Sequence, residues 1–248
     1  MRPSDGSRWP PDGGGAAGAI ADGVRGTPPA QVPARLCAIA VGLLPVTGAS
    51  ASLRGGDGHP VRLCASGDRA SCLAEIQATL GDGPCVHAAE TGTPVLVRDL
   101  RSGADACRWP VFAQQATAVG VRAVYAVPLG DDGVSVGTLD LYRDTPGGLT
   151  RDQLDTARLL AGAMTAALTA LPRDEEYGTG GGEESWLSGL AGDHDEVHRA
   201  VGMIMAQLGV GADEALARLR ADAFARDRTA HAAARDVLAH RRRFGGDG

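Results

Sequence analysis

The residues with the clearest chemical potential are arginines near the C-terminal end of the chain. Residues 216–244 hold eight arginines against three acids, which gives this segment a net charge of +5. On an ideal helix of about 100° per residue, Arg218 lies opposite the leucine stripe, Arg220 on its flank and Phe224 beyond. Because guanidinium planes and aromatic rings stack on unpaired RNA bases, this pattern indicates RNA binding, with Arg228 as a further candidate. Solvated arginines beside a buried phenylalanine would explain the same sequence.

Two short motifs resemble catalytic signatures but lack the context that those signatures need. GVSVG at 133–137 matches G-x-S-x-G, in which Ser135 would occupy a turn between a strand and a helix. The alternating TLDLY that follows predicts a strand instead, so we expect a hairpin turn. HDEVH at 194–198 has aspartate where the zinc-protease motif H-E-x-x-H has glutamate. We therefore expect no catalytic serine and no metal site.

The five cysteines, at positions 37, 64, 72, 85 and 107, include no C-x-x-C pair. Their odd number and irregular spacing favour reduced thiols over a disulfide framework. If Cys64, Cys85 and Cys107 approached one another, they could form a redox or metal sensor, although buried structural cysteine is the commoner case. A candidate ligand pocket combines two cysteines with three aromatic residues: Cys85, Cys107, Trp109, Phe112 and Tyr125. Core packing explains these aromatic residues equally well.

Composition excludes some classes of enzyme and suggests a compartment. All 24 basic residues are arginine. Without lysine, the chain cannot be a P-loop NTPase or a pyridoxal enzyme, because each needs a lysine at its reacting centre. The net charge of −6 comes from residues 1–186, which hold 21 acids and 15 arginines. The first 30 residues lack the apolar stretch of a signal peptide, and no apolar run of about 18 residues occurs. We therefore expect a cytoplasmic protein.

Three short helices are predicted to carry the basic segment. The first has an apolar stripe at helical spacing, formed by Val197, Val201, Ile204 and Leu208. Gly209 and Gly211 end it. The second has Leu216, Leu219 and Ala223 on one face, with two acids in its first turn. The third begins at Thr229, a suitable N-cap, and ends in three consecutive arginines.

This segment also resembles a known family. The string HRAVGMIMAQLGVGADEALARLRADAF, followed by AARDVL, is similar to the ANTAR domain, a three-helix RNA-binding module of transcription antitermination regulators. The resemblance covers residues 186–244 and implies RNA-binding roles at the matching positions, namely Ala200, Gly202, Met205, Arg220, Ala223 and Ala234. Two positions depart from the family pattern. Val201 stands where the family often has lysine, and Gly211 stands where it commonly has a capping serine.

The longer N-terminal part is expected to be an α+β domain, with a central antiparallel sheet and flanking helices. Strands are predicted at 49–53, 61–65, 95–97, 123–129 and 134–142, and helices at 32–44, 71–80, 84–91, 111–119 and 149–171. The motifs GDGP, TGTPV, RWP and GVRAV resemble a GAF domain of the kind that precedes ANTAR domains in actinobacteria. The resemblance covers residues 32–171. It implies a sensor without naming a ligand, because GAF pockets bind different molecules or none.

The expected organisation is a sensor joined to an output domain. Residues 1–31 and 245–248 are predicted to be disordered, and the glycine-rich residues 172–185 to form a linker. The GAF-like domain would sense a small molecule or a partner, and the ANTAR-like domain would bind hairpins in nascent transcripts. No enzymatic activity and no cofactor are expected.

A homodimer is predicted through the apolar side of the helix at 149–171. Two alternatives stay open. One is a ligand-binding regulator whose helical tail only dimerises and has no RNA role. The other is an enzyme on the same fold, such as a sulfoxide reductase that uses Cys85 or Cys107.

Overall fold

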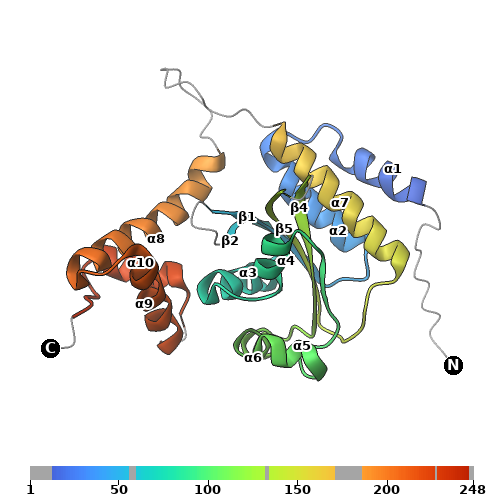
Figure 1. The fold of residues 1–248 in the computed structure, drawn as a ribbon. Coiled ribbons are helices and arrows are strands. Elements are labelled where there is room, and N and C mark those ends of the chain that lie inside the picture. Colours follow the sequence, from blue (N-terminus) through green and yellow to red (C-terminus); the bar gives the residue numbers. More distant parts are fainter. Residues whose placement is uncertain (1–12, 56–59, 132–133, 171–185, 227, 246–248) are drawn as a thin grey trace, which may run out of the picture.

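The structure is a computed structural model that describes residues 13–55, 60–131, 134–170, 186–226 and 228–245. A sheet with helices on both faces is followed by three helices that lie to one side of it (Figure 1). The predicted fold class, an antiparallel α+β domain followed by a three-helix unit, is confirmed. The predicted linker at 172–185 lies outside the described residues, as do 1–12 and 246–248 of the segments predicted to be disordered.

Five strands form one antiparallel sheet in the order β2-β1-β5-β4-β3. They are β1 (Gly48–Arg54), β2 (Pro60–Ala65), β3 (Val95–Val97), β4 (Ala123–Asp131) and β5 (Val134–Arg143). Side chains alternate between the two faces of a strand, so Leu139 and Leu141 of β5 point to one core and Asp140 and Tyr142 to the other. The edge strand β2 pairs only with β1, and its register shifts opposite Ala51 and Ser52.

One face of the sheet is covered by α2 (Val32–Leu43) and α7 (Arg151–Thr169), and α1 (Gly13–Val24) packs on the outside of these two helices (Figure 1). A capping box starts α7, because the Thr150 hydroxyl accepts from Gln153 N and the Gln153 side chain accepts from Thr150 N. Leu160 and Met164 of α7 are fully buried in this core. The side of α7 that was expected to pair with a second chain therefore packs against its own sheet.

The segment predicted to be disordered is partly helical. In the described part of residues 1–31, α1 and a 3-10 turn (Pro29–Gln31) precede α2. Ala16 and Ile20, four residues apart, are buried on one side of α1, and Ile20 belongs to the first core. The low apolar content of the stretch suggested disorder, but two apolar residues at helical spacing are enough to attach a short helix to an existing core.

The other face of the sheet is covered by α3 (Asp68–Leu80) and α4 (Pro84–Thr91), while α6 (Pro110–Ala118) packs on α3 and α5 (Gly103–Arg108) packs on α6. This second core contains Trp109 and Phe112 together with Cys85 and the inward residues of β4 and β5. We call the part of the described chain from residue 13 to residue 170 the sheet domain.

Three helices follow: α8 (Trp186–Leu208), α9 (Ala212–Ala225) and α10 (Ala230–Leu238). Their shared core is small and rich in alanine, with Ile204, Leu219 and Val237 fully buried. We call residues 196–245 the C-terminal bundle. Among the described residues, no single helix is long and apolar enough to cross a bilayer. Residues 196–208 and α9 together have the length and apolar composition of a membrane span, but the two helices are bent by 104° relative to each other.

Candidate nucleic-acid interface

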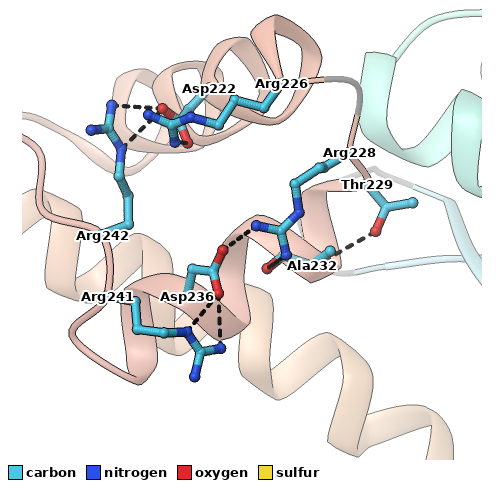
Figure 2. A network of polar contacts seen from close by, with 8 residues as sticks. All are labelled: Asp222, Arg226, Arg228, Thr229, Ala232, Asp236, Arg241 and Arg242. Carbon is cyan, nitrogen blue, oxygen red and sulfur yellow. Dashed lines mark hydrogen bonds and ion pairs between the residues drawn. The ribbon is translucent and has the colours of Figure 1, made fainter.

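Two aspartates organise the arginines of the C-terminal bundle, and the first is Asp222 on α9 (Figure 2). Arg226, one helical turn later, donates to Asp222 Oδ2 over 2.5 Å. Arg242, which follows α10, donates to Asp222 Oδ1 through Nε and Nη2 over 3.0 and 2.7 Å. Arg242 also stacks over the Phe244 ring at 5.2 Å. The tail after α10 is thereby fastened to α9.

The second aspartate is Asp236 on α10, which receives Arg228 from the α9–α10 loop and Arg241 from the tail (Figure 2). Arg241 Nε and Nη2 lie 2.9 and 2.8 Å from Asp236 Oδ1. Hydrogen bonds from Arg241 and then from Arg228 lower the pKa of Asp236, so its carboxylate stays charged. Arg228 also donates to the Ala232 carbonyl, which holds it beside the Thr229 N-cap of α10.

The result is a fixed basic surface. Four arginines share two aspartates, so the set keeps two positive charges while each guanidinium has a defined place. A guanidinium has five N–H donors, and these contacts use two at most in each arginine, so donors remain for a further anion. Phe224, on the same helix as Asp222, is 48% exposed instead of buried. An exposed ring and fixed guanidiniums on the same small bundle suit stacked bases and phosphates.

The RNA-binding residues predicted from the sequence are placed in three different ways. Ala200, Ala223 and Ala234 are buried between the three helices, so they set helix spacing and offer no surface to RNA. Gly202 is exposed, and Met205 is half-buried against the core. These positions come from a sequence resemblance, which marks them without showing their exposure.

The predicted arginines are also divided. Arg228 belongs to the basic surface, and Arg218 is exposed and paired with Glu214 at 2.9 Å. Arg220 instead reaches the sheet domain, where its Nη2 donates to the Ala78 carbonyl over 3.3 Å near the C-terminal end of α3. A helix C-terminus carries partial negative charge and open carbonyls, which attract a guanidinium. No pattern in the sequence predicts this contact, which joins residues 142 positions apart.

A second contact joins the two parts at the same place. The backbone N of Ala230, at the start of α10, donates to Thr79 Oγ1 over 3.1 Å. Both α9 and α10 contact α3, and α8 contacts β2 (Figure 1). In this arrangement Arg220 lies between the bundle and the sheet domain and does not belong to the open basic surface.

The five residues predicted to line a ligand pocket do not surround one cavity. Cys85, Trp109 and Phe112 are buried together on one side of the sheet. Tyr125 points to the opposite core, where its hydroxyl donates to the Gly147 carbonyl over 2.7 Å. Cys107 is exposed. Tyr125 and Cys85 are separated by the sheet itself, because alternate residues of a strand face opposite sides.

The second core contains polar groups that sequence reasoning missed. Asp140 of β5 is 1% exposed, and neither of its carboxylate oxygens has a hydrogen-bond partner among the described residues. Burial raises its pKa to about 7, an effect that the nearby Thr138 hydroxyl only partly offsets. Gln77 of α3 is also buried, and its Oε1 accepts from Cys85 N while its Nε2 has no partner among the described residues. One signal was available: an acid inside the strand motif TLDLY.

The structure also shows where the residues of the serine motif, the histidine motif and the cysteine cluster lie. Ser135 lies on β5, and its hydroxyl donates to the Gly137 carbonyl, so it does not occupy a strand-to-helix turn. In the described part of the chain, no group of three or more histidine, cysteine or acidic residues could hold a metal ion. The side chain of His194 lies outside that part. Cys64 does not meet Cys85 or Cys107; its sulfur lies 3.4 Å from that of Cys37.

Comparisons with known proteins agree with this geometry. The sequence pattern of the GAF domain matches residues 28–169, and that of the ANTAR domain matches residues 191–238. No curated protein matches the sequence.

The solved structures that are similar to this chain match about 62% of it. The GAF domain of an Acinetobacter phosphoenolpyruvate-protein phosphotransferase is 9% identical with a TM-score of 0.50, over 62% of this chain and 91% of that one. The corresponding domain from Coxiella burnetii is 16% identical with a TM-score of 0.49, over 62% and 91%. The free methionine-R-sulfoxide reductase of Neisseria meningitidis is 19% identical with a TM-score of 0.44, over 63% and 89%. At 9% identity, the likeness to the first concerns the fold alone.

Proposed function

This chain belongs to the GAF domain family and also carries an ANTAR domain, and from that premise we propose that it is an RNA-binding transcription antitermination regulator. The combination is typically regulatory and not catalytic. The bundle binds hairpins in nascent transcripts, in the cytoplasm, as in the actinobacterial type of GAF–ANTAR protein. The GAF domain senses a small molecule or a partner protein.

The observation that carries the proposal is the basic surface of the bundle. Its arginines are held by Asp222 and Asp236, so little side-chain freedom is lost when they meet a phosphate backbone. Arginine contacts to phosphates release counterions, which makes such binding fall steeply with salt. Phe224 supplies an exposed ring for unpaired loop bases.

The test removes charge without leaving an aspartate unpaired. In the double variant Arg226→Gln/Arg241→Gln, Asp222 keeps Arg242 and Asp236 keeps Arg228. We expect hairpin RNA to bind about 10-fold more weakly, since charge-assisted hydrogen bonds are lost. The slope of log affinity against log salt should fall by about 1 to 2.

A matched control is Arg25→Gln/Arg101→Gln, which removes two exposed arginines of the sheet domain, neither of which is on α7. It should leave RNA affinity unchanged. If the full chain bound no hairpin RNA, or if both double variants weakened binding equally, the proposal would fail. Failure of all RNA binding would favour the alternative in which the tail only dimerises.

A homodimer through α7 also supports this function, because two linked bundles engage neighbouring hairpins at high effective concentration. The sequence predicted pairing through the apolar side of α7, on which Leu160 and Met164 lie. Leu160 and Met164 are in the core, whereas Leu159, on the outer side of α7, is 43% exposed. We therefore place the pairing surface around Leu159.

A further inference from the structure

Two cysteines that the RNA-binding function does not use lie in sulfur contact. Cys37 on α2 and Cys64 on β2 are both free thiols, and their Sγ atoms are 3.4 Å apart. All five cysteines lie in the described part of the chain, and no other pair among them is in such contact. A disulfide has an S–S distance of about 2.05 Å, so the two sulfurs need to approach by little more than 1 Å.

The two thiols are chemically unequal. The hydrogen bond with Cys37 lowers the pKa of Cys64, and Ala51 and Arg62 add to that effect against the effect of burial. The same hydrogen bond and burial raise the pKa of Cys37. Cys64 is half-buried and Cys37 is fully buried. Cys64 is therefore the thiol that ionises more readily and that an oxidant in solution reaches first.

The position of Cys64 permits the small movement that bond formation needs. It lies on the edge strand β2, which has a neighbour on one side only. Its partner in the register is Ala51, directly beside the shift between Ala51 and Ser52. A strand held along one edge and next to an irregularity adjusts at lower cost than a central strand. Cys37, in contrast, is held in the core by α2.

We propose that Cys37 and Cys64 are a peroxide-oxidisable pair that forms an intrachain disulfide joining α2 to β2. The Cys64 thiolate attacks hydrogen peroxide, breaks the O–O bond and becomes a sulfenic acid, while the released hydroxide takes a proton to give water. The Cys37 sulfur then attacks Cys64 Sγ, loses its proton and displaces the hydroxyl group as a second water. Two thiols are oxidised to one disulfide, and one peroxide is reduced to two waters.

The experiment treats the folded full-length protein with one equivalent of hydrogen peroxide, blocks remaining thiols and digests with trypsin. Cleavage after arginine places Cys37 in peptide 36–54 and Cys64 in peptide 63–69. Cys72 and Cys85 share peptide 70–98, and Cys107 is in 102–108. Mass spectrometry should find 36–54 joined to 63–69, two hydrogens lighter than the sum, and dithiothreitol should separate them.

Serine variants assign the order of attack. In Cys37→Ser, Cys64 should stop at the sulfenic acid and be labelled by dimedone, whereas in Cys64→Ser, Cys37 should remain a thiol. The exposed Cys107 serves as an internal control for general oxidation. The proposal is overturned if Cys107 is oxidised while peptides 36–54 and 63–69 stay separate, or if they join only after denaturation. Either result would make the pair two thiols that merely pack together.

Discussion

The sheet domain and the C-terminal bundle place their aspartates in opposite surroundings. Asp140 lies inside the sheet domain, away from any arginine partner in the described structure, and its pKa is raised to about 7 by burial. Asp236 lies at the bundle surface, where Arg241 and Arg228 lower its pKa. The sheet domain thus buries a carboxyl that resists ionisation, whereas the bundle uses charged carboxylates to fix positive charge beside solvent. The two carboxyl groups therefore make contributions to stability that change with pH in opposite directions.

The largest expected effect concerns Asp140. Its pKa is about 7 in the folded chain against an ordinary 3.8, so between these values the folded chain keeps a proton that the unfolded chain has released. Its contribution to stability is complete below pH of about 4 and is lost by pH of about 7. At about 1.4 kcal/mol per pKa unit, the loss approaches about 4 kcal/mol. Asp140→Asn should therefore stabilise the protein at pH 8 and change little at pH 4, as measured by denaturant unfolding.

Asp236→Asn provides the opposite comparison. Because the pKa of Asp236 is lowered in the fold, its contribution is present above its ordinary pKa and is lost as pH falls. At neutral pH, Asp236→Asn should therefore lower the free energy of unfolding, whereas Asp140→Asn should raise it. Both differences from the unchanged protein should become smaller as the pH falls. Equal pH profiles for the two variants would contradict the contrast between the regions.

A smaller effect is expected at the proposed dimer surface. Leu159→Asp places a charge on the exposed side of α7 and should yield monomers in light scattering. Affinity for a two-hairpin RNA should fall about 100-fold through lost avidity, with little change for one hairpin. Val111→Asp on α6 is the matched control, since Val111 is 40% exposed and Leu159 is 43% exposed. A monomeric unchanged protein, both free and with RNA, would disprove the dimer.

Most of the fold could be predicted from local patterns. The strand expected at 134–142 is β5 (Val134–Arg143), and the helix expected at 149–171 is α7 (Arg151–Thr169). Both have clear periodicity and clear starts. The helix α1 was missed because it is stabilised by packing on a core that other segments form, and its own sequence contains few apolar residues. The apolar side of α7 was expected to pair with a second chain, because periodicity identifies an apolar stripe without saying what covers it.

Less of the site could be predicted, because it depends on distant residues. The charge of the segment indicated a basic surface, but Arg242 lies 20 residues beyond Asp222, and only the folded tail joins them. Cys37 and Cys64 are 27 residues apart on different elements, so spacing carried no information about their contact. Arg220 follows the same helical pattern as Arg218, yet its contact with Ala78 is 142 residues away in sequence.

The smallest expected effect tests the contact between the two regions. Gly81 is the left-handed C-cap of α3, with φ of +65°, and a Cβ there would lie 2.5 Å from Arg220 Nη1. Gly81→Asn keeps the backbone conformation, which asparagine tolerates, and displaces the guanidinium at the end of a flexible side chain. If this contact withholds Arg220 from RNA, hairpin affinity should rise about 3-fold to 5-fold, as the loss of one hydrogen bond of about 1 kcal/mol allows.

The control is Gly103→Asn, because Gly103 has a similar φ of +73° and a Cβ there would meet nothing within 4 Å. It reproduces the backbone strain without touching the bundle, so it should leave RNA affinity unchanged. Hydrogen exchange at the Ala230 amide, which donates to Thr79, reports separately whether the bundle has moved away from α3. Faster exchange with unchanged affinity in Gly81→Asn would show that the regions touch without competing with RNA. Faster exchange with increased affinity would show that the contact with α3 keeps Arg220 of the bundle from binding RNA.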